Sequence, residues 1–194
     1  MGIKGDELVF FSIFITLVII QRITELRIAR KNEKWMKANG GFEVGHGHYK
    51  YIVLVHVLFF LSLIFEVSYF NKAISSLWLV FLLFFSLAQG LRVWCLLSLG
   101  RFWNTKIIVV PNVNIISKGP YKFIRHPNYL VVVIELLVIP LIFSAFWTAI
   151  VFTLLNMLVL SIRIPIEENA LIRETNYKAV FHQRSRFAPT RERT

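Results

Sequence analysis

The stretch GPYKFIRHPNY, residues 119–129, gathers a lysine, an arginine, a histidine, two tyrosines and two prolines between strongly apolar segments. Pro127 biases His126 away from helical geometry and suits the first turn of a helix, where its missing N–H costs nothing. The stretch therefore predicts a short element that ends at His126 and a helix that begins at Pro127. The unpaired amides of such a helix start, beside His126 and Tyr129, attract a carboxylate or a phosphate, although a purely structural cap accounts for the same residues.

A second polar cluster, RIPIEENALIRE at residues 163–174, follows the last apolar segment. Arg163 and Glu167 are four positions apart and share one face if the helix continues past Pro165. An ordinary ion pair at a membrane exit explains this spacing on its own. An arginine at this position also suits the binding of an anionic oxygen, because a guanidinium donates charge-assisted hydrogen bonds in a fixed geometry.

The composition indicates where these residues work. Hydrophobic residues make up 56% of the 194 residues and the mean hydropathy is +0.62, which is too apolar for a soluble domain of this length. In a membrane protein the formal net charge of +11 is explained by orientation in the bilayer, so no nucleic-acid partner is expected. Cys95 is the single cysteine, which rules out a disulfide framework within the chain and a cysteine-based metal site.

Four long gaps between charged residues predict the membrane spans. They cover residues 8–21, 51–65, 73–91 and 136–162. The first two gaps are short for a bilayer at about 1.5 Å per residue, so their helices must continue into polar flanks. No small-residue cleavage site follows the first gap, and we expect an uncleaved span there.

Loop charge indicates how the last gap folds. Residues 22–37 carry six Lys and Arg, residues 99–127 carry five and residues 163–194 carry seven. These basic segments share one side of the membrane only if residues 136–162 form a hairpin that turns near residues 140–147. We therefore expect an all-α integral membrane protein of about five transmembrane helices, with the N-terminus outside and the C-terminus in the cytoplasm, where positive loops belong.

Several polar side chains fall within or at the edge of the apolar segments, where an unpaired charge is costly. They are His56, Glu66, Gln89, Arg92, Glu135 and Asn156. Gln89 and Arg92 share a helix face, and Arg92 is expected to pair with Glu66 or Glu135. The set either holds the helices in register or lines a cavity for a ligand, and the sequence leaves both interpretations open.

The connection NEKWMKANGGFEVGHGHY, residues 32–49, is polar and contains a Gly-Gly break. Its His46 and His48 suggest a metal pair, but Glu43 is the only further residue of ligand type beside them. A plain interfacial loop without a metal is the favoured interpretation.

Together these motifs resemble the isoprenylcysteine carboxyl methyltransferase family. The pattern GxYxxxRHPxY, then RxxxEE after an apolar hairpin, and a tail ending in RFAP carry the resemblance over residues 100–190. The N-terminal half, with ELRIARKNEKW and GHGHY, is more similar to a bacterial branch that O-methylates alkylpyrones than to the eukaryotic prenyl-protein enzymes. We expect one domain, residues 1–194, with three spans in residues 1–98 and the cofactor-binding and catalytic region in residues 99–194.

The resemblance implies a membrane methyltransferase that depends on S-adenosyl-L-methionine and encloses this cofactor in a cytoplasmic pocket formed by its C-terminal third. By position, the implied cofactor-binding residues are Val113, Asn114, Ile115, Ile116, Tyr121, His126, Pro127, Asn128, Tyr129 and Glu167. The implied catalytic residues are Arg163, which faces the substrate, and Glu167. Tyr177 and Phe181 can substitute for the Phe-Gly pair and the spaced tyrosines that the family often has after its double glutamate.

The implied reaction is O-methylation of a lipophilic acceptor at the membrane, either a carboxylate such as that of an isoprenylcysteine or an acidic hydroxyl such as that of an alkylpyrone. Such an oxygen is ionised near neutral pH, so positioning and desolvation matter more than a strong base. Two alternatives remain: a phospholipid N-methyltransferase, and a membrane scaffold or transporter without enzymatic activity. Arg163 favours an oxygen acceptor, because an amine offers no anion to a guanidinium.

Overall fold

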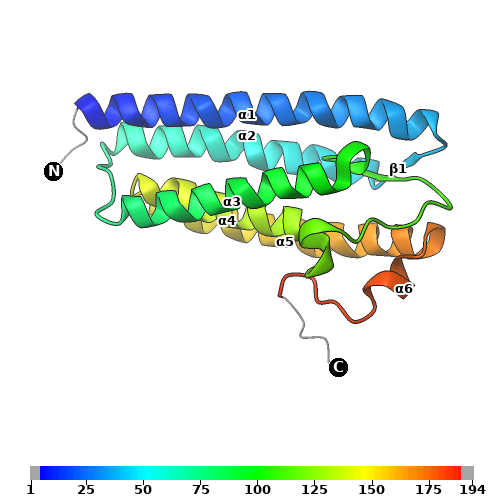
Figure 1. Ribbon diagram of the computed structural model, residues 1–194. Helices are drawn as coiled ribbons and strands as arrows, with labels where there is room; N and C mark the ends of the chain where they lie inside the picture. The colour runs from blue at the N-terminus through cyan, green and yellow to red at the C-terminus, as the bar shows by residue number, and fades with distance from the viewer. Residues whose placement is uncertain (1–4, 189–194) are drawn as a thin grey trace.

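The computed structural model describes residues 5–188; the remaining terminal residues, including Pro189 of the RFAP run, lie outside the described part. Five long helices, each antiparallel to the next along the chain, form an elongated bundle (Figure 1). They are α1 (Gly5–Ala38), α2 (His46–Tyr69), α3 (Trp78–Leu99), α4 (Pro127–Ile142) and α5 (Phe146–Glu174). A short helix, α6 (Tyr177–Phe181), lies beside the end of the bundle where α5 ends.

The lengths of these helices fit a membrane protein. Four of them, α1, α2, α3 and α5, are long and apolar enough to cross a bilayer. α1 has 34 residues and continues far into its polar flank, as predicted. α4 has only 16 residues, a length of about 24 Å. The prediction of an all-α integral membrane protein is confirmed, with four candidate spans and one shorter apolar helix.

α4 and α5 form the predicted hairpin, and the turn lies within the predicted residues 140–147. The backbone amide of Ala145 donates to the carbonyl of Pro140 at 2.9 Å and closes the turn. Phe143, in the turn, is fully buried, and its ring centroid lies 4.8 Å from that of Phe11 and 5.6 Å from that of Phe14, both on α1. These edge-on aromatic contacts fix α1 against the hairpin at the end of the bundle away from the polar motifs.

Glu66 does not pair with Arg92, which corrects one of the two expected partners. Its carboxylate accepts hydrogen bonds from the backbone amides of Trp147, at 3.2 Å, and Thr148, at 2.7 Å, in the first turn of α5. The Thr148 hydroxyl donates to the same carboxylate at 2.8 Å. A carboxylate at this position satisfies amides that have no partner within the helix and interacts favourably with the helix dipole. Glu66 on α2 therefore caps α5.

Arg92 pairs instead with Glu135, the other expected partner, and with Glu25 at 3.1 Å. Arg22 contacts the same two carboxylates, and Gln89 donates to Glu135 at 2.6 Å. Two arginines and two glutamates thus balance their charges between α1, α3 and α4. Sequence reasoning did not assign Arg22 and Glu25 to this cluster, because they belong to the charged flank that follows the first apolar gap.

The connection predicted as a loop contains a strand, which corrects that prediction. After α1 ends, β1 (Phe42–Val44) pairs antiparallel with β2 (Ile107–Val109), so that Glu43 lies opposite Ile108. Strands of three residues carry too little periodicity to be predicted. This small sheet ties the connection between α1 and α2 to the connection between α3 and α4.

His46, the one histidine of that connection whose side chain is described, belongs to no metal site within the described residues. His46 is exposed, and its Nε2 lies 3.8 Å from Glu43 Oε2. Within the described residues no group of three His, Cys, Asp or Glu side chains is arranged to hold a metal ion. The side chain of His48 is outside the described part.

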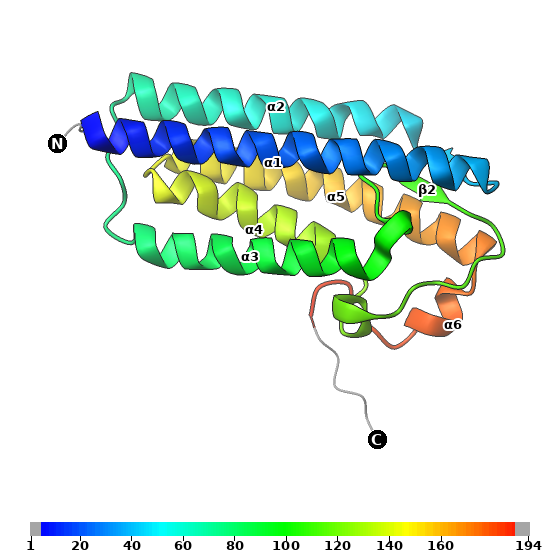
Figure 2. The same ribbon diagram turned by 45° about the horizontal axis from the view of Figure 1, so that its top comes forward.

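The basic segments of the described chain gather at one end of the bundle, as the hairpin requires (Figure 2). The C-terminal part of α1, the connection from α3 to α4 and the residues after α5 all lie there. The connection from α2 to α3 and the turn from α4 to α5 lie at the opposite end. One end of the bundle thus carries both polar motifs.

Candidate functional site

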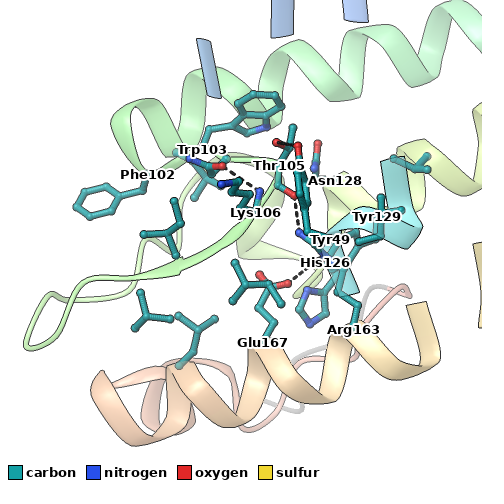
Figure 3. Close-up of a pocket in the computed structure, with 18 of the residues that line it drawn as sticks. Tyr49, Phe102, Trp103, Thr105, Lys106, His126, Asn128, Tyr129, Arg163 and Glu167 are labelled. Atoms are coloured by element: carbon teal, nitrogen blue, oxygen red, sulfur yellow. Dashed lines mark hydrogen bonds between the residues drawn. The ribbon is translucent and has the colours of Figure 1, made fainter. Parts of the chain in front are cut away.

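A cavity of about 430 Å³ lies toward the basic end of the bundle (Figure 3). Its walls come from the five long helices, from α6, from β2 and from the segments on either side of β2. This volume is in the range of small-molecule binding sites. The predicted site residues that line it are Val113, Asn114, Ile115, Ile116, Tyr121, His126, Asn128, Tyr129, Arg163 and Glu167.

The GPYKFIRHPNY stretch folds as the sequence predicts. A 3-10 turn, η2 (Gly119–Lys122), precedes His126, and α4 begins at Pro127. Gly119 has φ +59°, and a Cβ there would lie 2.0 Å from Ser98 Oγ, so no other residue fits. Pro127 is buried and is absent from the cavity wall among the predicted site residues. In the described structure Pro127 is the first residue of α4.

Arg163 is held on two sides by the described chain. Its Nε donates to the Tyr129 hydroxyl at 2.7 Å, and its Nη2 donates to the backbone carbonyl of Thr105 at 2.6 Å. Its guanidinium carbon also lies 5.6 Å from the centroid of the Tyr129 ring. Nη1 has no hydrogen-bond partner within residues 5–188 and is not occluded there. The arginine is therefore fixed in orientation with one terminal nitrogen open.

Glu167 acts on Arg163 through Tyr129. The Tyr129 hydroxyl donates a hydrogen bond to Glu167 and accepts one from Arg163 Nε. α5 continues past Pro165, so both residues rise from one face of α5 toward the cavity, as predicted (Figure 3). Among the described residues, Arg163 and Glu167 do not form the direct ion pair that their spacing suggested. Tyr129 connects them through two hydrogen bonds. Tyr129 is therefore the link between the two motifs.

His126 is turned toward the neighbouring glutamate, Glu168. His126 Nε2 lies 3.0 Å from Glu168 Oε1, and its ring stacks on that of Tyr129 with centroids 5.4 Å apart. The Glu168 carboxylate also pairs with Arg125 and Arg186. Because it is fixed by these contacts, it holds His126 in position on the cavity wall. Sequence reasoning assigned Glu168 no role, although the double glutamate of RIPIEE was the available signal.

Glu168 also anchors the segment that follows α6. Arg186 donates to its two oxygens at 3.2 and 2.6 Å, and Arg125 lies 3.1 Å from it. The backbone amides of Arg125 and His126 donate to the carbonyls of Ser185 and Arg186, each at 3.1 Å. The C-terminal segment is thus fastened across the start of α4, directly behind the cavity wall.

The segment 113–116, whose residues the resemblance implies as cofactor-binding, lines the cavity. Asn176, after α5, accepts a hydrogen bond from the Ile115 amide at 2.8 Å and donates one to Asn114 Oδ1 at 3.1 Å. Asn176 also directly precedes α6, whose Tyr177 and Phe181 line the cavity as well. Segments that are distant in the sequence therefore form one wall.

Two buried tyrosines on this wall stay protonated. Burial, reinforced by Cys95, raises the pKa of the Tyr121 hydroxyl well above that of a free phenol. Burial and then the charge of Glu168 raise the pKa of Tyr177. Both side chains are therefore neutral hydrogen-bonding groups at physiological pH.

Five residues that line the cavity each carry a buried polar atom without a hydrogen-bond partner in the described chain: Arg92, Trp103, Arg125, Asn128 and Asn156. Asn128 Oδ1 and Trp103 Nε1 are buried and make no hydrogen bond within the described chain, and both residues line the cavity. Buried polar groups are nearly always paired in folded proteins. An unpaired acceptor and an unpaired donor in one cavity wall indicate a place for a polar ligand.

Sequence reasoning missed the wall opposite α5, which is built by Tyr49 and the WNTK run of residues 103–106 (Figure 3). The Tyr49 hydroxyl lies 3.3 Å from Thr105 Oγ1, and Lys106 Nζ contacts Glu33 at 3.0 Å. Burial lowers the pKa of Lys106, but its hydrogen bonds to Glu33 and Glu43 outweigh this and raise it overall. The polar WNTK run after the third span was the signal that could have located this wall.

Comparison with known proteins places these motifs in context. Residues 78–173 match the family model of the isoprenylcysteine carboxyl methyltransferase (ICMT) family, which covers both polar motifs and the hairpin between them. The chain is 48% identical over 161 residues to the uncharacterized protein YpbQ of Bacillus subtilis (strain 168), covering 83% of this chain and 96% of that protein. It is 28% identical over 165 residues to an uncharacterized protein of Haemophilus influenzae (strain ATCC 51907 / DSM 11121 / KW20 / Rd), covering 84% of this chain and 96% of that protein.

Proposed function

The chain belongs to the isoprenylcysteine carboxyl methyltransferase family, a family of membrane methyltransferases, and on that premise we propose that it uses S-adenosyl-L-methionine to methylate an anionic oxygen of a lipophilic acceptor. The observation that carries this proposal is the fixed guanidinium of Arg163, with its open Nη1, in the same cavity as the residues of the GPYKFIRHPNY motif. The donor and the acceptor then share one cavity.

The chemistry of the wall fits the donor. The unpaired Oδ1 of Asn128 suits an amino group, and the Glu167 carboxylate suits the ammonium group of the amino-acid portion. The aromatic rings of Tyr121, Tyr177 and Phe181 suit a positively charged sulfur, because a cation is attracted to the face of an aromatic ring. Bound S-adenosyl-L-methionine would supply a methyl group on that sulfur, and a neutral thioether would leave as the carbon–oxygen bond forms.

Arg163 would hold the acceptor oxygen through Nη1. Because Nε and Nη2 are already committed to Tyr129 and Thr105, the guanidinium loses little freedom when it binds the oxygen. An ionised carboxylate or acidic hydroxyl needs no base, so the chain's contribution is orientation and exclusion of water. An amine acceptor must instead be neutral and gains nothing from Arg163, which favours an oxygen acceptor over a phospholipid amine.

The acceptor would reach the cavity from the bilayer. Apolar residues of α1 and α2 form the part of the wall that lies deeper in the bundle. Three of them, Leu26, Val53 and Val57, are still 37%, 43% and 50% exposed. This apolar, incompletely covered wall suits an alkyl or prenyl chain. We place the basic end of the bundle in the cytoplasm on the charge rule, with the N-terminus outside.

Transfer of a radiolabelled methyl group into lipid extracts tests the proposal. The purified full chain is incubated with labelled S-adenosyl-L-methionine and extract, and the product is treated with base. A base-labile product identifies a carboxyl ester, and a stable uncharged product identifies an ether of an acidic hydroxyl such as an alkylpyrone. A labelled amine, or no labelled lipid with folded protein, contradicts O-methylation.

A further inference from the structure

Polar side chains lie among the apolar residues at the deeper end of the cavity, where a hydrocarbon chain would lie. Asn156 is seven residues before Arg163 on α5, and His56 is seven residues after Tyr49 on α2, so both lie about 10 Å deeper in the bundle than the Arg163 level. Both residues line the same cavity as Arg163. Arg22 of α1 lines it at this depth as well, and it shares a small adjoining void with His56.

His56 presents an acceptor at this position. Its Nδ1 lies 2.8 Å from the backbone carbonyl of Ile52. A carbonyl can only accept, so Nδ1 carries the hydrogen and the Nε2 of the neutral ring has a free lone pair. No hydrogen bond to Nε2 is found within residues 5–188, and that atom is not occluded.

Asn156 presents an unused donor. The residue is 3% exposed, and its Nδ2 has no hydrogen-bond partner within the described chain. An amide without a partner at membrane depth is costly, because lipid offers no hydrogen bonds. Asn156 lines the cavity, so a ligand that brings an oxygen to this level would satisfy the amide once the side chain turns toward that oxygen.

The charges behind these two residues are balanced. Arg22 and Arg92 are paired with Glu25 and Glu135, so the cluster has no net charge to attract an anion. Arg22 keeps a 20% exposed side chain. The deep wall therefore suits a neutral hydroxyl group, whose oxygen can accept from the Asn156 amide and whose hydrogen can be donated to His56 Nε2.

We propose that His56 and Asn156 form a second polar subsite, which recognises a neutral hydroxyl group in the acceptor about 10 Å from the oxygen held by Arg163. This inference rests on the proposed function and narrows its substrate class. The preferred acceptor is a hydroxylated amphiphile, and a prenyl or saturated chain without such a hydroxyl group is the poorer ligand.

The test compares two probes that differ by one oxygen, stearic acid and its mid-chain hydroxylated analogue, whose carboxylate occupies the Arg163 position. Affinities for the detergent-solubilised full chain are measured by calorimetry with and without S-adenosylhomocysteine. The variants are His56→Phe and Asn156→Leu. Thr153→Val is the matched control, because Thr153 Oγ1 is also a buried polar atom without a partner on α5, while Thr153 is absent from the residues that line the cavity.

The wild-type protein should bind the hydroxylated probe at least about fivefold more tightly than stearic acid, the effect of one additional hydrogen bond. This ratio should fall toward one in His56→Phe and Asn156→Leu and persist in Thr153→Val. Comparing this ratio between the wild type and the variants cancels the different partitioning of the two probes into detergent, because that difference is the same for every protein. An equal affinity of the wild type for both probes, or a preference that both variants retain, overturns the subsite.

The binding of S-adenosylhomocysteine is read separately in the same titrations. If the folded protein does not bind S-adenosylhomocysteine, the methyltransferase proposal is contradicted. The ratio of the two probe affinities is also measured without S-adenosylhomocysteine and does not depend on that result. The two proposals therefore fail through different measurements.

Discussion

Arg163 Nε donates a hydrogen bond to the Tyr129 hydroxyl over 2.7 Å, and this contact joins the two polar motifs of the sequence. Tyr129 belongs to GPYKFIRHPNY and Arg163 to RIPIEE, on opposite arms of the α4–α5 hairpin. The same hydroxyl donates to Glu167. The Tyr129 hydroxyl, which donates one hydrogen bond and accepts another, thus positions the Arg163 guanidinium. Nη1 of this guanidinium remains open in the cavity.

Replacing Arg163 by lysine keeps the positive charge but removes the planar fork that Tyr129 and Thr105 hold. We expect kcat/KM for methyl transfer to fall at least about tenfold, or about 1.4 kcal/mol in transition-state stabilisation. The affinity for S-adenosylhomocysteine should be retained. Methyl transfer by Arg163→Lys at the wild-type rate would remove the guanidinium from the reaction.

Tyr129→Phe removes the hydroxyl and leaves the aromatic ring. Arg163 would keep its bond to the Thr105 carbonyl but lose its link to Glu167, so its orientation should loosen. We expect kcat/KM to fall by about tenfold, with a loss of about 1–3 kcal/mol in stability, because two buried groups lose a partner. Steady-state rates and a thermal denaturation of the same preparation check both effects. Tyr51→Phe, which alters an exposed phenol outside the cavity, is the control, and equal losses in both variants would contradict a positioning role for Tyr129.

Glu168→Gln should release the C-terminal segment from the start of α4. Glu168 is contacted by Arg186, Arg125 and His126, and a neutral amide cannot replace these charge-assisted contacts. Hydrogen exchange at the amides of residues 125 and 126 should accelerate by about tenfold, because these amides are bonded to the segment. Glu167→Gln should leave this protection unchanged. Unaltered exchange in Glu168→Gln would show that backbone bonds alone fasten the segment.

Glu66→Gln tests the cap that joins α2 to α5. The carboxylate accepts hydrogen bonds from the first amides of α5, and we expect its neutralisation to cost about 1–2 kcal/mol of stability. The measurement is the thermal midpoint in detergent. Ser86→Ala serves as control, because the Ser86 hydroxyl bonds only to Leu82 of its own helix among the described contacts. Glu66 is remote from the cavity, so a loss of ligand affinity in place of stability would contradict its assignment as a cap.

The sequence predicts the hairpin and the helix start well because both follow from strong local signals. Pro127 begins α4 as expected, and the distribution of basic residues requires the turn near Phe143. The partner of a buried charge is harder to predict, since it depends on which helix faces meet. Arg92 pairs with Glu135, as expected, whereas Glu66 caps α5.

The missed part of the site has a related cause. Thr105 contributes a backbone carbonyl to Arg163, and a carbonyl has no sequence signature. Glu168 was overlooked beside Glu167 because adjacent residues on a helix point in different directions, about 100° apart, and the spacing from Arg163 selected only one of them. Three-residue strands such as β1 and β2 have no detectable period, so the connection that contains β1 was predicted as a loop and the wall beside β2 was not predicted.

Calorimetric titration of the purified full chain with S-adenosylhomocysteine shows whether the cavity binds the cofactor. We expect saturable binding at one site per chain, weakened at least about tenfold by Glu167→Ala and retained in Arg163→Lys. The absence of saturable binding to folded wild-type protein would contradict the proposal that the chain uses S-adenosyl-L-methionine.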